Sequence, residues 1–158
     1  MIRTLLYNKT SNEVISGGKE LVTVWQQNAD TCIWFDCSAE PEDTEAQFLQ
    51  DSFGLHPMAI QDAQRPRHPP KIEAFDSSTF MLLKPLSADS EDLHFSTIQL
   101  ALFIGERFLV TRRSGASPIT ETLFDQATRT AEIPAGGPAR LALRLCRMLV
   151  DRYLKILL

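Results

Sequence analysis

Residues 53–86 constrain the fold more than any other part of this chain, because their glycine and prolines fix the backbone at several points. Gly54 suits the left-handed position that ends a helix. Pro57 suits the first turn of a second helix, where its missing N–H costs nothing. The prolines between positions 65 and 70 exclude helix and favour an extended path. The segment therefore predicts two short helices, a fixed turn and a return of the chain as a strand.

Strands are predicted on both sides of this segment, from runs of β-branched and aromatic residues that are bounded by turn residues. The apolar run at 21–25 fits a short helix or a strand, because such a run alone cannot distinguish them. The predicted strands are residues 2–7, 13–16, 31–37, 71–75, 79–86, 93–104 and 107–112.

The first of the two short helices is expected to begin with Ser38 as its N-cap, because acidic residues follow it, and to end near Ser52. Another helix is expected at 118–130, followed by a linker or cap at 134–138. The inward-facing residues of the two short helices are expected to be Ala46, Leu49 and Phe53 in the first and Met58, Ile60 and Ala63 in the second.

The last segment has the clearest helical pattern, because its charged residues form a stripe at spacings of three and four. The rest of its circumference is apolar, so a sheet or neighbouring helices must cover it. The charges argue against a membrane span. The sequence stops at Leu157-Leu158 without a capping residue, so we expect a fragment of a longer polypeptide. The stripe consists of Arg140, Arg144, Arg147, Asp151 and Lys155.

Length and composition are those of one soluble domain, with 158 residues of which 44% are hydrophobic and 23% charged. The formal net charge of −4 argues against nucleic acid as a partner. No secretory signal and no window of ~18 apolar residues is present. The three cysteines do not form a paired framework and indicate reduced thiols, with Cys32 and Cys37 as small core residues.

The order of the predicted elements indicates the fold class. Strands and helices come first, then a meander of four strands, then helices. This order predicts an α/β or α+β fold in which a mixed sheet carries helices on its faces.

Enzyme motifs are absent from the sequence. It contains no GxSxG, GxxxxGK[ST], GxGxxG or HExxH. His56, His68 and His94 are too scattered for a helical metal pair, and structural or surface roles are expected. Since no nucleophile, base and orienting group can be assembled, a soluble enzyme is disfavoured. The acidic runs at 40–45 and 89–92 are expected to be solvated faces.

Asp62 is the carboxylate with the strongest claim to a function, because it ends the second short helix beside a basic turn. One interpretation is a local ion pair with Arg65 or Arg67. The other is that Asp62 faces a partner surface and offers an oxygen to Mg²⁺ or another divalent cation. Mg²⁺ keeps several waters and needs only one or two carboxylates from a protein.

Residues 53–86 resemble the central motif of the CorA family of divalent-metal transporters. That motif reads roughly FG(I/L)HPL(A/V)(I/L)ED, followed by a turn that ends in proline, PK(V/I)E and an apolar strand. The similarity extends from about Trp34 to the end, and the central motif is its most specific part. The matching residues are Phe53-Gly54-Leu55-His56-Pro57, Ile60, Asp62, Pro70-Lys71-Ile72-Glu73, Phe80-Met81-Leu82-Leu83-Lys84, Leu100-Ala101-Leu102-Phe103-Ile104, Phe108-Leu109-Val110-Thr111 and Leu149-Val150-Asp151-Arg152-Tyr153.

The resemblance implies a three-layer α/β/α sandwich with a mixed parallel and antiparallel sheet, ending in a helix that leads into a stalk helix. Residues 1–158 would form a single N-terminal cytoplasmic domain of a longer protein. In the family, that protein is a homopentamer with two membrane helices per subunit in the cell inner membrane. The domain would be no enzyme and would gate a passive channel for Mg²⁺, Co²⁺ or Ni²⁺.

Two alternatives stay open beside this interpretation. One is the zinc-transporting branch that resembles ZntB proteins, with the same fold and a different ion. The other is a free-standing soluble regulatory domain. The family's Gly-Met-Asn selectivity motif is absent from this sequence, so the ion cannot be inferred from it.

The resemblance also gives Asp62 a role. In some members a regulatory Mg²⁺ binds at a subunit interface, and Asp62 matches the aspartate of that site, whose usual partner lies on the stalk helix. No other cofactor is implied. Gln61 replaces the family's glutamate, and Arg147 stands where a second acidic residue is expected on the late helix. An amide and a cation at these positions lower the affinity for a hard dication.

Overall fold

The computed structural model describes residues 1–91 and 94–158, and its strands form one seven-stranded sheet in the order β2-β1-β3-β7-β6-β5-β4. The central pair, β3 and β7, is parallel, and every other neighbouring pair is antiparallel, so the sheet is mixed. The strands are β1 (Ile2–Asn8), β2 (Val14–Gly17), β3 (Thr31–Cys37), β4 (Lys71–Ala74), β5 (Thr79–Leu83), β6 (Leu100–Ile104) and β7 (Phe108–Arg113).

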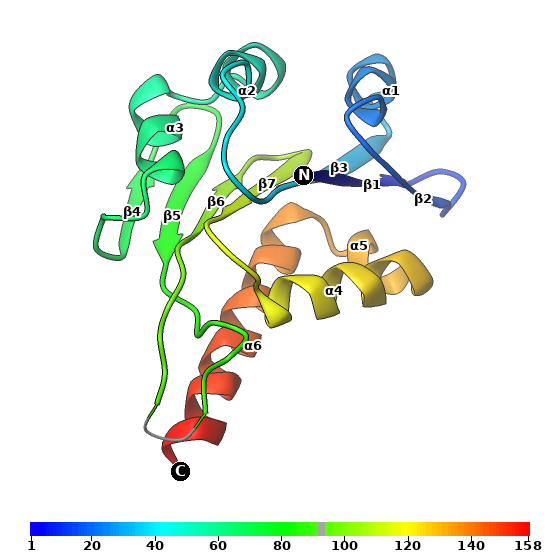
Figure 1. The fold of residues 1–158 in the computed structure, drawn as a ribbon. Coiled ribbons are helices and arrows are strands. Elements are labelled where there is room, and N and C mark those ends of the chain that lie inside the picture. Colours follow the sequence, from blue (N-terminus) through cyan, green and yellow to red (C-terminus); the bar gives the residue numbers. More distant parts are fainter. Residues whose placement is uncertain (92–93) are drawn as a thin grey trace.

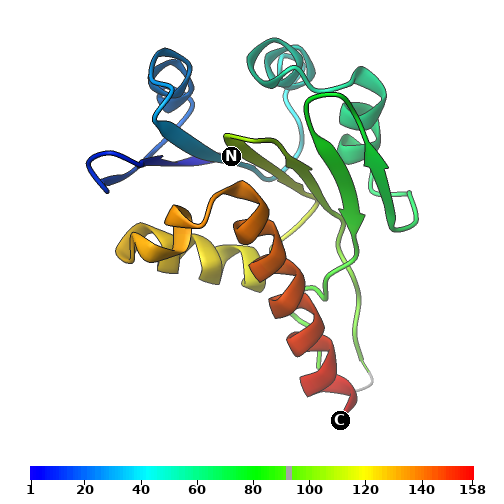
Figure 2. The ribbon, with the colours of Figure 1, turned by 180° about the vertical axis from the view of Figure 1, so that it is seen from behind.

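Helices cover both faces of this sheet (Figure 1). One layer consists of α1 (Leu21–Gln27), α2 (Glu45–Phe53) and α3 (Pro57–Gln64). The opposite layer consists of α4 (Pro118–Arg129), α5 (Glu132–Ala135) and α6 (Pro138–Leu157). The view from behind shows the same two layers with the sheet between them (Figure 2). The predicted three-layer α/β/α sandwich with a C-terminal helix is therefore confirmed.

Each helical layer has its own hydrophobic core, and strand β3 contributes to both. Ile33 and Phe35 of β3 pack with the α1–α3 layer, and Trp34 between them packs with the α4–α6 layer. All of β3 is buried, as expected for a strand covered on both faces. Cys37 is fully buried in the first core, and Cys32 is buried as well, so the prediction that both are buried residues is confirmed.

The predicted start of the first short helix is wrong. α2 begins at Glu45, and Ser38 caps no helix; its hydroxyl donates to the Met1 carbonyl oxygen instead. The expected inward set is also wrong at Met58, which is 63% exposed, whereas Ala59 is buried in its place. The α3 helix turns Ala59, Ile60 and Ala63 toward the core. Ile60 and Ala63 follow Ala59 by one and four positions, so the three residues lie on one face of the helix.

The strand predicted at 93–104 is too long. β6 begins at Leu100; among the described residues between β5 and β6, the strand pairing consists of the isolated bridges Leu86 to Thr97 and Glu91 to His94. Residues 92 and 93 lie outside the described residues, and with them the end of the acidic run and the start of that strand. The segment at 21–25 is the helix α1, and the predicted linker at 134–138 includes part of α5.

Only the first half of α6 is buried. Leu141, Ala142 and Leu145 pack into the core of the α4–α6 layer. Further along the helix, Val150 and Leu154 are about half exposed. The sequence predicts that other elements must cover the apolar surface of this helix. The sheet side is covered, and the apolar residues further along the helix are partly exposed. Among the helices of the described residues, none is both long and apolar enough to cross a membrane.

Candidate functional site

The α3 helix positions Asp62 in its last turn. Its start is fixed by His56, whose Nδ1 accepts a hydrogen bond from the Met58 N–H at 3.1 Å, with Pro57 in the first turn. At its end, the Arg65 N–H donates to the Asp62 carbonyl oxygen at 3.3 Å. The proline-rich turn that follows carries the chain back as β4, which brings Lys71 beside Asp62.

Both carboxylate oxygens of Asp62 already have partners. Oδ2 lies 2.6 Å from Lys71 Nζ, and Oδ1 lies 3.2 Å from His68 Nε2. Lys71 Nζ also lies 2.6 Å from Glu73 Oε1. These hydrogen bonds, first with Asp62 and then with Glu73, raise the pKa of Lys71 above its usual value and hold it as the ammonium.

The expected local pair of Asp62 is therefore wrong in its partner. Arg65 turns toward Gln61: in the orientation that satisfies its hydrogen bonds, the Gln61 amide oxygen accepts from Arg65 Nη2 and Nη1 at 3.0 and 3.2 Å. The returning strand supplies Lys71, and the turn before it supplies His68, because the proline turn folds the backbone against α3. Gln61 and Arg65 line an open groove between α2 and α3 of about 450 Å³.

Gln99 anchors the backbone of the site, and the sequence reasoning missed it. This side chain is 1% exposed, and its Nε2 donates to the carbonyl oxygens of Asp62, Ala63 and Arg65 at 2.9, 3.3 and 3.3 Å. Its Oε1 accepts from Lys84 Nζ at 3.2 Å. The only signal in the sequence is one polar residue directly before an apolar strand.

A hydrogen-bonded chain links this anchor to the last helix. The Tyr153 hydroxyl of α6 donates to the Lys84 carbonyl oxygen at 2.7 Å, and Lys84 reaches Gln99. Desolvation by burial lowers the pKa of Lys84 from its usual value. The end of α3 and the C-terminal part of α6 are thus connected through Lys84, directly after β5, and Gln99, directly before β6.

Glu45 corrects the prediction that the acidic run at 40–45 is a solvated face. Glu45 is buried, and Arg112 of β7, 2% exposed, donates to both of its carboxylate oxygens, Nε to Oε2 at 3.0 Å and Nη2 to Oε1 at 3.1 Å. Gln64 Nε2 at the end of α3 also donates to Glu45 Oε2, at 2.8 Å. The pair ties α2, α3 and the centre of the sheet together.

Asp62 has no complete metal-binding set around it. The residues that the structure describes contain no group of three His, Cys, Asp or Glu side chains arranged to hold a metal ion. Arg147 does not approach Asp62, since α6 lies in the opposite helical layer (Figure 1). A cation at Asp62 therefore needs further oxygen ligands from water or another chain.

The sheet order and the two helical layers are those of soluble domains of metal-ion transporters. The chain superposes on the soluble domain of CorA from Methanocaldococcus jannaschii with a TM-score of 0.74 and 17% identity, covering 97% of this chain and 58% of that one. It superposes on the ZntB cytoplasmic domain from Vibrio parahaemolyticus RIMD 2210633 with a TM-score of 0.68 and 12% identity, covering 96% and 60%. At such identities the similarity establishes the fold.

The sequence establishes the family. The chain belongs to the CorA-like Mg²⁺ transporter protein family, whose sequence model matches residues 29–158. It is also 29% identical over 113 residues to "Putative metal ion transporter YfjQ" from Bacillus subtilis (strain 168). That match covers 72% of this chain and 34% of the relative, so the chain spans about a third of the relative's length. The resemblance to the CorA family is confirmed, and the family is one of ion transporters.

Proposed function

We propose that residues 1–158 form the cytoplasmic, gating domain of a CorA-like divalent-cation transporter of the cell inner membrane. The family match over residues 29–158 carries this proposal. The full protein is a pentamer that passes Mg²⁺, and also Co²⁺, down the electrochemical gradient. Its membrane helices follow the domain in the chain.

Asp62 is the regulatory cation ligand in this proposal. It supplies one carboxylate to a Mg²⁺ that keeps most of its waters and bridges two adjacent domains. High cytoplasmic Mg²⁺ then favours the bridged, closed arrangement, and low Mg²⁺ releases it. Gating follows only if the cation binds the closed state more tightly than the open one.

Lys71 sets the condition for that binding. Its ammonium lies 2.6 Å from Asp62 Oδ2, so a cation that binds this oxygen directly must displace it. Lys71 can move without losing all of its pairing, because Glu73 holds it from the other side at 2.6 Å. Alternatively, the cation contacts Asp62 through one of its bound waters, and Lys71 stays in place.

The test is the Mg²⁺ dependence of transport by the full-length pentamer. Asp62→Asn removes the charge and keeps the shape, and we expect inhibition by cytoplasmic Mg²⁺ to require several-fold higher concentrations. Asp76→Asn is the matched control, because Asp76 is an exposed aspartate in the β4–β5 turn, on the same hairpin as Lys71. Unchanged Mg²⁺ inhibition in the Asp62 variant, with normal transport, would show that Asp62 is not the regulatory ligand.

The transported ion is tested separately from the regulatory site. The ZntB branch shares the fold, as the superposition on the Vibrio domain indicates, and differs in ion. Uptake of Mg²⁺, Co²⁺ and Zn²⁺ by the full-length protein in vesicles distinguishes the two branches. Preference for Mg²⁺ and Co²⁺ supports the proposal, and uptake of Zn²⁺ alone assigns the chain to the zinc branch. If the native protein ends at residue 158, it is a soluble regulatory domain instead.

A further inference from the structure

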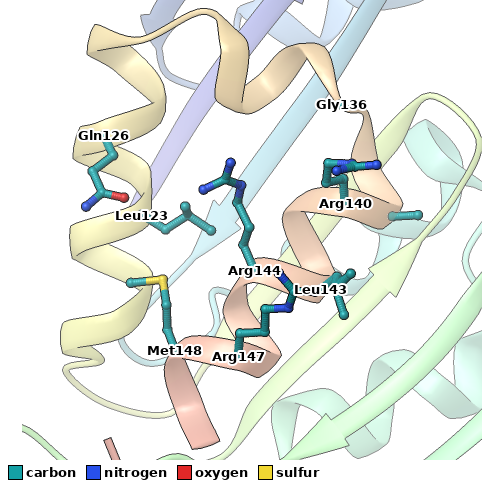
Figure 3. Close-up of a pocket in the computed structure, with 9 residues that line it drawn as sticks. Leu123, Gln126, Gly136, Arg140, Leu143, Arg144, Arg147 and Met148 are labelled. Carbon is teal, nitrogen blue, oxygen red and sulfur yellow. The ribbon is translucent and has the colours of Figure 1, made fainter. Parts of the chain in front are cut away.

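A groove between α4 and α6 gathers three arginines on the helical layer opposite Asp62. Arg140, Arg144 and Arg147 line it from α6, and Leu123 and Gln126 line it from α4. The arginines are spaced by four and three residues, so they follow one face of the helix. Figure 3 shows the Arg144 side chain reaching into the space between the two helices, beside Leu123.

These three arginines have no protein partner among the residues that the structure describes, since neither an ion pair nor a hydrogen bond of their guanidinium groups is present. Several arginines elsewhere in the fold do have partners. Arg112 binds Glu45, and Arg113 binds Asp36 and Glu121. Like charges at a spacing of four destabilise a helix slightly.

The walls of the groove fit a ligand with an anionic head. Its volume is about 740 Å³, within the range of small-molecule sites. Met148 and Leu123 offer apolar surface next to the charges (Figure 3). The stem of Arg140 lies against Gly136, where an added Cβ would come within 2.5 Å of the Arg140 Cδ. The glycine thus leaves room for Arg140 to fold back over the turn.

We propose that this groove binds a pyrophosphate or triphosphate group. Guanidinium forks match phosphate oxygens in pairs, and three of them balance the charge of a linked di- or triphosphate better than that of a single phosphate. The charge is local, because the whole chain carries a formal net charge of −4. Soluble polyphosphates, nucleoside triphosphates and phosphorylated lipid head groups share this chemistry.

The experiment titrates the 158-residue chain in low salt without Mg²⁺. Its arms use inorganic triphosphate, ATP, and vesicles of phosphatidylcholine with and without a bisphosphorylated inositol lipid. We expect saturable binding of triphosphate, weakened about tenfold by Arg144→Gln and abolished by the triple change of Arg140, Arg144 and Arg147 to Gln. Arg129→Gln is the matched control, because Arg129 is exposed on α4 outside the groove. This variant should bind triphosphate as the unaltered chain does.

Every outcome decides the proposal. Tighter binding of ATP than of triphosphate identifies a nucleotide as the source of the phosphates, and binding of the lipid vesicles alone identifies a head group. Arg144→Lys, which keeps the charge and loses the fork, should bind with intermediate affinity. The proposal is overturned if no arm shows saturable binding, or if Arg129→Gln weakens binding as much as Arg144→Gln. Thermal melts of all variants show that the loss is not unfolding.

Discussion

The two helical layers of this domain differ in how completely their charged side chains are paired. In the α1–α3 layer, ionised groups find partners inside the fold: Glu45 binds Arg112, and Asp62 binds Lys71. In the α4–α6 layer, Glu121 of α4 pairs with Arg113, whereas the arginines of the groove have no such partner among the described residues. Paired charges in the first layer hold helices to the sheet. The charges of the groove arginines are therefore available to a ligand from outside the domain.

This difference separates architecture from recognition. A buried pair with good geometry fixes which elements meet, and removing one member leaves an uncompensated charge. An exposed group of like charges contributes nothing to the fold and costs a little helix stability. Substitutions should therefore lower stability in the first layer and change binding in the second.

Breaking the Glu45–Arg112 pair should have the largest effect. Glu45→Ala leaves the Arg112 guanidinium buried without its bidentate partner, and we expect the free energy of unfolding to fall by about 3–5 kcal/mol, measured by urea denaturation. The double variant Glu45→Leu with Arg112→Met replaces the pair by apolar groups and should recover most of this loss. If the double variant is no more stable than Glu45→Ala alone, the pair is not the cause.

Removing the Gln99 anchor should have the next largest effect. Gln99→Leu leaves the carbonyl oxygens of Asp62, Ala63 and Arg65 without this donor, and we expect a loss of about 1–3 kcal/mol in the free energy of unfolding. Gln50→Leu, on an exposed position of α2, should change stability by less than about 0.5 kcal/mol. Equal losses in the two variants would contradict the anchoring role.

Local patterns explain why so much of the fold could be predicted. Gly54, with φ of 66°, and Pro57 at the first turn of α3 do what their chemistry dictates. The order of the predicted elements does not distinguish an α/β from an α+β fold. The family motif indicates the three-layer arrangement. The ends of the elements are predicted less well: Thr44, directly before α2, makes no side-chain capping hydrogen bond, so a search for a capping residue does not find this helix start.

The candidate site was harder to predict, because its contacts join residues that are distant in the sequence. The position beside a basic turn and the family motif both indicate Asp62, but its partner Lys71 lies across the proline turn, and Arg65 and Arg67 are nearer in the sequence. The acidic run around Glu45 predicts a solvated residue, because nothing local indicates its partner Arg112, which follows 67 positions later. Gln99 contacts the end of α3 across 34 to 37 positions of the sequence, so no local pattern identifies it.

Lys71 offers a smaller test of the Asp62 site. Lys71→Met removes the ammonium that occupies Asp62 Oδ2, and we expect the affinity of the chain for Mg²⁺ to rise about two- to fivefold, the value of an exposed ion pair. NMR titration with Mg²⁺ measures this at the backbone amides near Asp62. Lys155→Met on α6 removes one charge at a distance and is the control. An equal rise in both variants would mean that net charge, and not displacement at Asp62, sets the affinity.

The cysteines give the smallest effect and compare the two layers without altering either. Cys37 is fully buried in the α1–α3 core, and burial raises the pKa of its thiol well above the usual range. Cys146 of α6 is half-buried, and burial raises its pKa as well. Since both thiols have higher pKa values in the folded state than in the unfolded chain, the free energy of unfolding should fall slightly as the pH rises above about 8.5.

At pH 8, a thiol reagent followed by mass spectrometry should label Cys146 first and Cys37 only after unfolding in urea. If Cys37 is labelled as fast as Cys146 in the folded chain, the core of the α1–α3 layer exposes its thiol as readily as α6 does, and the expected difference between the layers is wrong.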